Sequence, residues 1–361
     1  ENIPRGKWSE IQSARGGSGN ASTSWDRTNY YQSFPSNELK LALWMESERL
    51  LHPIVDQKAV DTQNEVVKEE KRQRMDNAPY GKIQYGMVYK HLFDKHNYGR
   101  SLIGFIEDLD NAKLDEFKAF YDKWYMPNNA VLVVAGDFEK EETKSLIKDY
   151  FEPIPSRTLP NRVQISEPER LEQKRVKEYD ANIQLPMIVL MHKTPSMRER
   201  DAKVLDVIST ILSDGKSSRL QKKMVEDKKK ALGVFSFGRP LMDYSVYTIG
   251  AIPLGENSLD DLITEMDEEI VKLQTTLISD EDLQKVRNKF ENRFVSSNSN
   301  IQGIASSLAS NYMLMGDTNR INTELELVMS ITKEEIREAA KKYLAKNRRV
   351  VIDYLPESQK K

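Results

Sequence analysis

Residues 114–134, LDEFKAFYDKWYMPNNAVLVV, can be laid over residues 333–353, KEEIREAAKKYLAKNRRVVID, at a fixed offset. The offset is 219 (343 minus 124), which places Trp124 on Tyr343. Each stretch predicts an amphipathic helix that leads through a turn into a short apolar strand. A period of this length is too long for a solenoid. The two stretches therefore indicate two copies of one domain.

The repeat predicts the domain boundaries. We expect a first domain over residues 1–152, a proline-containing linker over residues 153–173 and a second domain over residues 174–361. Subtracting 219 from 174 gives −45, about 45 residues before Glu1. The first domain is therefore expected to lack its N-terminal part in this sequence.

Runs of predicted strands are followed by runs of predicted helices, which is typical of an α+β protein. We expect two tandem homologous α/β-sandwich domains, each with an antiparallel-rich sheet and helices packed on it. The predicted strands or hairpins cover residues 21–34, 130–135, 183–192 and 233–252. The main predicted helices cover residues 38–51, 57–75, 114–124, 140–151, 198–212, 218–227, 258–275 and 280–296.

The composition is that of a globular protein with ordinary cores. Of 361 residues, 39% are hydrophobic and 30% charged, and the formal net charge of −2 gives no attraction to nucleic acid or to an anionic membrane. No apolar run is long enough to span a bilayer. The absence of cysteine excludes disulfides and thiolate metal sites, and it suits either a cytosolic or an exported bacterial protein.

The charged helix predicted at residues 57–75 contains the stretch QNEVVKEEKR at 63–72. One interpretation is a solvated helix with i,i+4 pairs, among them a favourable Glu70–Arg74 pair. The alternative starts from Val66 and Val67, which form a narrow apolar face. Glu70 lies four residues after Val66 and would share that inward side. A carboxylate in such a position needs a cation or a metal as its partner.

The four histidines form no complete zinc motif, because none is spaced i,i+4 from another with a carboxylate between them. His91 and His96 make a weak candidate metal pair, and structural or capping roles are favoured for both. Nucleophile-elbow, P-loop and dinucleotide-binding patterns do not occur in the sequence.

Three segments resemble the pitrilysin and mitochondrial processing peptidase family of inverted zinc metallopeptidases, whose motif is H-x-x-E-H. They are GGSGNASTSWDRTNYYQSFPSNELKLALWMESERL at 16–50, NEVVKEEKRQRMDNAPYG at 64–81 and WYMPNNAVLVVAGDF at 124–138. The resemblance covers both copies and is closest to the bacterial half-size members. It implies two similar α+β domains in each subunit, and two subunits that close around a chamber.

In that family, two motif histidines and a distant glutamate bind Zn²⁺, and the motif glutamate activates a metal-bound water. The distant ligand follows a V-V-x-x-E pattern, which the resemblance places on Glu70. Family spacing then places the second motif histidine at position −6 (70 minus 76), and the repeat maps positions −10 and −6 onto Ser209 and Ser213. Residues 1–361 contain neither the H-x-x-E-H motif nor its general base, so no catalytic residue is assigned.

A second family site uses an Arg and a Tyr to hold the substrate backbone. The matching stretch here is MVEDKKKALGVFSF, with Val225 near the Arg position and Gly233 near the Tyr position. The resemblance therefore implies a homodimer, or a heterodimer with a related subunit that carries the Arg/Tyr pair.

The family also pairs extended substrates with an edge strand, which the resemblance places on Asn20, Ala21, Ser22 and Thr23. An ordinary edge strand is an equally good interpretation. Nearby polar and aromatic side chains could line the site or pack the sheet, and packing is favoured for the tyrosines; these residues are Asp26, Arg27, Tyr30 and Tyr31.

The leading hypothesis is a Zn²⁺-dependent endopeptidase half-subunit that acts on peptides or unfolded segments, and that lacks its zinc motif in this sequence. The rival hypothesis is a non-catalytic structural or peptide-binding subunit of the same fold, which retains Glu70 by accident. A scaffold without any role in peptide binding is a third, weaker idea.

Overall fold

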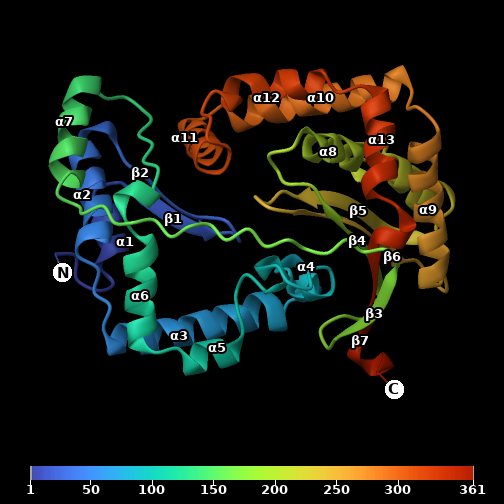
Figure 1. The fold of residues 1–361 in the computed structure, drawn as a ribbon, viewed down its shortest axis with the longest axis horizontal. Coiled ribbons are helices and arrows are strands. Elements are labelled where there is room, and N and C mark those ends of the chain that lie inside the picture. Colours follow the sequence, from blue (N-terminus) through green and yellow to red (C-terminus); the bar gives the residue numbers. More distant parts are fainter. Residues whose placement is uncertain (1, 361) are drawn as a thin grey trace. The chain divides into compact units, whose positions relative to one another are not determined.

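The computed structural model describes residues 2–360, which form helices and two β-sheets (Figure 1). The α-helices are α1 (Lys7–Ala14), α2 (Leu39–Leu51), α3 (Gln57–Lys71), α4 (Gly81–Gln84), α5 (Ile106–Asn111), α6 (Leu114–Trp124), α7 (Lys140–Phe151), α8 (Arg200–Ser213), α9 (Leu259–Thr275), α10 (Asp280–Ser297), α11 (Ile301–Ser310), α12 (Arg320–Met329) and α13 (Lys333–Tyr343). The strands are β1 (Ser18–Thr23), β2 (Thr28–Ser33), β3 (Lys174–Asp180), β4 (Met187–Thr194), β5 (Ala231–Arg239), β6 (Ser245–Pro253) and β7 (Arg349–Pro356).

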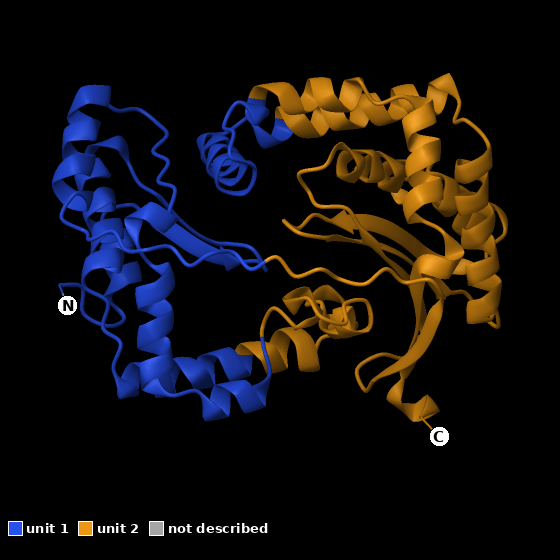
Figure 2. Cartoon of the chain, viewed as in Figure 1, with its two compact units in different colours: residues 1–69, 104–163, 296–321 blue, residues 70–103, 164–295, 322–361 orange. Residues whose placement is uncertain are grey.

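The chain divides into two compact units, which Figure 2 shows in different colours. Unit 1 comprises Glu1–Glu69, Gly104–Val163 and Ser296–Ile321, and unit 2 comprises Glu70–Ile103, Gln164–Val295 and Asn322–Lys361. The units therefore differ from the two halves expected from the sequence, because each unit includes a segment of the other half. The sequence-based domain boundaries stay a prediction.

Unit 2 is built around a five-stranded sheet of order β3-β7-β4-β6-β5. The β7–β4, β4–β6 and β6–β5 pairs are antiparallel, and only the β3–β7 pair is parallel. This topology confirms the expectation of an α+β protein with an antiparallel-rich sheet. Arg175 of β3 binds Asp353 of β7 through its Nε and Nη2 atoms at 2.9–3.1 Å, which ties the parallel pair together.

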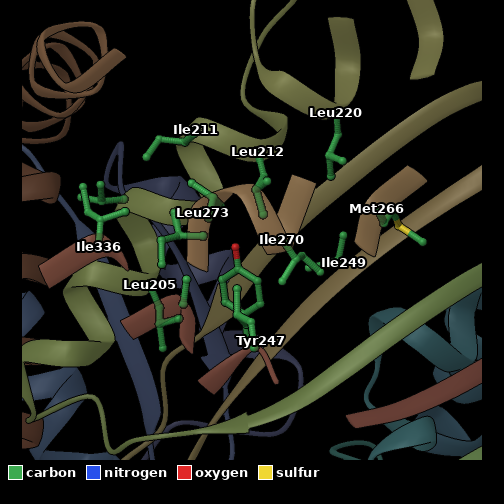
Figure 3. Packing of buried hydrophobic residues seen from close by; sticks show 14 of the residues in the cluster. Leu205, Ile211, Leu212, Leu220, Tyr247, Ile249, Met266, Ile270, Leu273 and Ile336 are labelled. Carbon is green, nitrogen blue, oxygen red and sulfur yellow. The ribbon is translucent and has the colours of Figure 1, made fainter. Parts of the chain in front are cut away.

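The core of unit 2 lies between this sheet and helices α8, α9 and α13. The helices bury the residues of one face at helical spacing, as Val204, Leu205, Ile208 and Leu212 do on α8. Figure 3 shows Leu205 and Leu212 of this cluster beside side chains from β6 and α9. The buried β4 and β7 strands are nearly continuous apolar runs, because both of their faces are covered.

Unit 1 contains a two-stranded sheet, the antiparallel hairpin β1–β2. The hairpin turns at Ser24, whose amide donates to the carbonyl oxygen of Arg27 at 2.8 Å. Among the described residues, unit 1 buries few large apolar side chains: Leu43, Met45, Val60, Met126 and Ile154. A two-stranded hairpin is only marginally stable alone, so unit 1 depends on its helices.

Element bounds in the two halves correspond at the offset predicted from the sequence. Subtracting 219 from α13 (333–343) gives 114–124, the bounds of α6, and subtracting it from β6 (245–253) gives 26–34, which includes β2 (28–33). The segment that each unit takes from the other half also corresponds, since 70–103 plus 219 is 289–322 and unit 1 includes 296–321. These correspondences support the duplication, which stays an interpretation.

The strand expected at residues 130–135 is wrong, because the structure assigns no strand there. Its counterpart β7 is hydrogen-bonded to β3 on one side and to β4 on the other. Residues 130–135 have no neighbouring strand among residues 2–360, and an extended segment without a partner forms no ladder. By the same offset, the counterparts of β3 and β4 would have negative numbers (174 minus 219 is −45).

Two predicted helices are also partly irregular. The helix expected over 57–75 is α-helical to Lys71 and continues as a π-helical turn, η2 (Arg72–Asp76). Most of the helix expected over 218–227 is likewise π-helical, η6 (Gln221–Asp227). The hydrophobic period used for the prediction does not distinguish these geometries, because a π-helical turn occurs as a single-turn bulge within an α-helix.

The core of unit 2 predicts a position-dependent cost of truncating leucine. Leu212 is 0% exposed and Leu232 is 50% exposed. We expect Leu212→Ala to lower the free energy of unfolding by about 2–5 kcal/mol, because it removes packed atoms and leaves a cavity. Leu232→Ala is the matched control and should change it by less than about 0.5 kcal/mol. Urea denaturation followed by circular dichroism measures both, and equal effects would contradict the described core.

Candidate functional site

Glu70 lies one residue before the end of α3, where the helix passes into the π-helical turn η2. Its Oε1 atom lies 3.0 Å from Nη1 of Arg74, and its side chain is 40% exposed. The pair is the i,i+4 pair expected of a solvated helix. Single π-helical turns within α-helices often occur at functional sites. The backbone geometry therefore keeps Glu70 as a candidate functional residue.

The expected inward apolar face of α3 is wrong. Val66 is 50% exposed, and the Glu70 carboxylate reaches solvent rather than a core. The helix contacts its surroundings through polar groups instead, since Nδ2 of Asn64 donates to the carbonyl oxygen of Leu109 at 3.1 Å and Lys68 pairs with Asp110 at 2.6 Å. Two adjacent valines are too short a pattern to fix which side of a charged helix is buried.

The turn after Glu70 is held by a buried cation. Lys71 is buried, and its Nζ donates to both carboxylate oxygens of Asp76 at 2.8–2.9 Å. The backbone of Gly81 packs closely against this turn, because a Cβ there would lie 2.5 Å from the carbonyl oxygen of Met75. Only glycine fits this approach. The backbone around Glu70 is therefore fixed, although its side chain is not buried.

Three of the four histidines contact carboxylates. Nδ1 of His52 contacts Glu48 at 2.9 Å, and Nε2 of His91 contacts Glu178 at 2.6 Å. Nδ1 of His96 accepts the amide of Tyr98, and its Nε2 contacts Asp243 at 3.1 Å. These contacts agree with the structural and capping roles favoured for His91 and His96.

His192 is fully buried in β4, and burial lowers its pKa to about 3. It is thus held neutral in the core. Over residues 2–360, no group of three or more His, Cys, Asp or Glu side chains is arranged to hold a metal ion. Glu70 is accordingly one potential ligand without companions in this part of the chain.

Asn20, Ala21, Ser22 and Thr23 form the greater part of β1, and all of them are exposed. β1 pairs with β2 on one side, and no other described strand joins the sheet. The amide of Ala21 donates to Oδ1 of Asn20 at 2.8 Å, so this N–H is directed away from the hairpin ladder. The strand thus has an open edge whose hydrogen bonding is partly satisfied by its own side chain.

The side chains next to this edge have structural partners. The Tyr30 hydroxyl lies 2.7 Å from that of Tyr125, and the guanidinium of Arg49 lies 4.2 Å from the Tyr30 ring centroid. Burial raises the pKa of Tyr30 well above its usual range. Packing, as favoured for the tyrosines, is confirmed for Tyr30. Asp26 is paired with Arg162 at 3.6 Å, and Nη1 of Arg27 donates to Oγ of Ser22 at 3.2 Å.

The stretch that would carry the Arg/Tyr pair is rich in lysine. Val225 packs against the core of unit 2, and Gly233 lies in the edge strand β5 at a register shift. Lysines at 223, 228 and 230 surround the buried Glu265 at 2.7–3.0 Å. Burial would raise the pKa of Glu265, but the lysine hydrogen bonds outweigh it and lower the pKa to about 2. Neither Arg nor Tyr occurs between residues 224 and 237.

The repeat also relates the expected zinc-ligand positions to residues of the second half, and these are not metal ligands of the expected kind. Ser209 and Ser213 lie on α8, and Oγ of Ser213 is 3.0 Å from Oγ of Ser236. Adding 219 to 70 gives Lys289, whose Nζ is 3.3 Å from the Asp214 carboxylate. On this interpretation, a lysine paired with Asp214 stands where the first half has Glu70.

One anchoring residue gave no signal in the sequence. Glu167 lies in the expected linker, is buried, and accepts the backbone amides of Asp94, Lys95 and His96. Several backbone donors on one carboxylate make a strong anchor. The partners are more than 70 residues away, so only the tertiary structure reveals the contact.

The chain matches two models of one peptidase family. Residues 1–105 match "Insulinase (Peptidase family M16)", and residues 111–290 match "Peptidase M16 inactive domain". The chain belongs to peptidase family M16, the family that includes pitrilysin. Lys289 and the two serines of the second half agree with the description of an inactive domain.

Relatives and solved structures agree with this membership. The zinc protease PqqE of Helicobacter pylori is 26% identical over 346 residues, which cover 95% of this chain and 77% of that protein. A solved structure of a protease from Helicobacter pylori superposes with a TM-score of 0.91 at 25% identity, over 98% of this chain and 86% of the other. An M16 inactive domain from Pseudomonas fluorescens has a TM-score of 0.82 at 15% identity, over 96% and 82% of the two chains, and shows the shared fold. Among residues 2–360, no helix has the length and apolar character to cross a bilayer.

The contact between Glu178 and His91 predicts a pH dependence of stability. Burial would raise the pKa of Glu178, but hydrogen bonds from His91 and Lys90 outweigh it and lower the pKa from 4.5 to about 2. A lowered folded-state pKa contributes stability above the unfolded pKa, and this stability is lost as pH falls toward the folded value. We expect Glu178→Gln to reduce stability at neutral pH, and the deficit to shrink between pH 4.5 and about 2.

Urea midpoints measured across this pH range test that expectation. Glu141→Gln, at an exposed carboxylate on α7, is the matched control and should show no such trend. A deficit that stays constant as the pH falls would contradict the role of the ionised Glu178.

Proposed function

We propose that this chain is a half-subunit of a zinc metalloendopeptidase that cleaves peptides or unfolded segments. The observation that carries the proposal is the V-V-x-x-E pattern ending at Glu70, in a chain of family M16 whose relatives are named zinc proteases. Glu70 would be the carboxylate ligand. The fixed backbone around Lys71 and Gly81 supports a positioned side chain at this point.

The described residues do not by themselves fit a zinc ion. Protein zinc sites use at least three side-chain ligands, and residues 2–360 offer no cluster of three potential ligands. Glu70 is instead neutralised by Arg74 at 3.0 Å. The proposal therefore requires two further donors from outside residues 2–360, and no hydrolytic step can be assigned to the described side chains.

Substrate binding is proposed for the open edge of β1. An extended peptide would add a third strand beside Asn20–Thr23, and backbone hydrogen bonds would provide affinity with little sequence preference. The exposed backbone of β1 supports this role. The Asn20 side chain would have to release the Ala21 amide, and it could then bond the peptide itself.

We further propose a dimer, either of two copies or with a related subunit that carries the Arg/Tyr pair. The stretch around Val225 and Gly233 contains neither Arg nor Tyr. Its lysines are already paired with Glu265 and Glu268, so they are not free to hold a substrate. A partner would have to supply the residues that hold the substrate backbone, within a chamber that the two subunits close.

The second candidate is a non-catalytic, peptide-binding subunit of the same fold. The Glu70–Arg74 pair favours it, because a surface ion pair explains this carboxylate without any metal. The open β1 edge would serve peptide binding equally well in either case. Zinc content separates the two candidates.

The zinc test measures metal in residues 1–361 and in the full-length natural polypeptide. We expect stoichiometric zinc in the natural polypeptide, loss of most of it in Glu70→Gln, and none in residues 1–361. Glu65→Gln on the same helix is the matched control and should retain zinc, because Glu65 is exposed and pairs with Lys68. Atomic absorption after dialysis measures the metal. Zinc retention in Glu70→Gln would contradict the assignment.

The β1 edge is tested with a pair of fluorescein-labelled extended peptides that differ only in N-methylation of alternate amides. If the peptide adds a strand, methylation of the edge-facing amides should weaken binding by about tenfold or more, since each lost hydrogen bond costs about 1 kcal/mol. Fluorescence polarisation reports the affinity. Equal binding of both peptides would exclude strand addition.

A further inference from the structure

Helix α12 is the element through which the chain returns from unit 1 to unit 2, because the last segment of unit 1 ends at Ile321. Near the C-terminal end of α12, Val328 is buried in the core of unit 2. Near its N-terminal end, Oε1 of Glu324 lies 2.5 Å from Nζ of Lys203 on α8. A charged contact therefore attaches this part of α12 to α8.

Lys203 has a second carboxylate within reach. Its Nζ lies 3.4 Å from Oδ2 of Asp206, which is three residues further along α8. The lysine is thus shared between a carboxylate on its own helix and a carboxylate on α12. The attraction between two charges falls with distance, so the contact with Glu324 is the stronger of the two in this structure.

Asp206 is half-buried between α8 and the sheet of unit 2. A Cβ on Gly238 of β5 would lie 3.1 Å from Oδ1 of Asp206, so the glycine leaves room for the carboxylate. The titratable or charged groups that face Asp206 are Lys203 on α8, Glu324 on α12, Arg293 on α10 and Tyr247 on β6.

The two partners on α8 respond differently to these surroundings. Burial raises the pKa of Asp206 above 3.8, although Lys203 opposes it. Burial would lower the pKa of Lys203, but Asp206 and Glu324 outweigh it and raise the pKa. A raised folded-state pKa of an acid contributes stability below the unfolded pKa, and this stability is lost as pH rises through the folded value. Lys203 therefore stays charged while Asp206 changes from neutral to ionised.

We propose that Asp206 and Glu324 compete for Lys203, so that the attachment of α12 to α8 changes with pH. When Asp206 is neutral, Lys203 pairs with Glu324 alone and holds α12. When Asp206 is ionised, it draws Lys203 toward its own helix, and the contact with α12 weakens. The N-terminal part of α12 is the part that responds, because Val328 keeps the other end in the core. The inference does not depend on the proposed function.

Hydrogen exchange followed by mass spectrometry tests the competition. The protection of α12 is expressed relative to that of α13, which is packed in the core and reports any change in global stability. Between about pH 5 and about pH 8, a range in which ordinary glutamates are ionised, the relative protection of α12 should fall. The expected fall is about two- to fivefold, which corresponds to a partly exposed ion pair.

Two variants separate the roles of the carboxylates. Asp206→Asn is neutral at every pH, so it should keep the protection of α12 at the low-pH level and remove the trend. Glu324→Gln should remove the trend as well, but with α12 at or below the high-pH level. Glu281→Gln, at an exposed carboxylate of α10 that pairs with Lys285, is the matched control and should keep the trend.

A trend that persists in Asp206→Asn would overturn the proposal. It would also be overturned if α12 were less protected in Asp206→Asn than in the unaltered chain, because Asp206 would then support the attachment rather than compete with it. A relative protection that rises with pH would place the controlling ionisation on Glu324 and would likewise overturn it.

Discussion

Burial of apolar helix faces stabilises a folded domain, and the two halves of the chain differ in how far such faces are buried. In unit 2 the faces of α8, α9 and α13 cover one another and the sheet, which leaves Leu212 and Ala340 fully buried. In unit 1 the equivalent face of α6 carries exposed aromatics. At about 25 cal/mol per Å² of apolar surface, covering an aromatic side chain stabilises by a few kcal/mol. Among residues 2–360, the aromatic face of α6 is therefore exposed, whereas the corresponding face of α13 is packed.

On the repeat interpretation, the two halves differ in chemistry at corresponding positions. At the positions that the repeat relates to the expected metal ligands, the second half has Ser209, Ser213 and Lys289, and Lys289 is paired with Asp214. The first half keeps a carboxylate at Glu70, on a backbone fixed by the Lys71–Asp76 contact. Lys289 in the second half thus corresponds to Glu70 in the first. This difference suits a protein in which the second half is structural and the first is proposed to bind metal.

Periodicity and turn residues predicted most helices, since α6 and α7 have the bounds expected from the sequence. The strand at 130–135 was mispredicted because its pattern is that of a strand, while a strand also requires neighbours that residues 2–360 do not provide. Glu70 was proposed through a motif. Its expected inward position was wrong, because Val66, on the same side of the helix, is exposed. The Glu167 anchor and the Asn20–Ala21 hydrogen bond could not be predicted, since the first joins distant residues and the second depends on a rotamer.

Hydrogen exchange of the α6 and α13 amides tests the central claim most directly, because protection reports whether a helix is packed. In residues 1–361, α13 should exchange slowly and α6 much faster. This difference is expected because the face of α13 is packed in the core of unit 2, whereas Phe120 on α6 is 60% exposed. Equal exchange of the two helices would contradict the described packing.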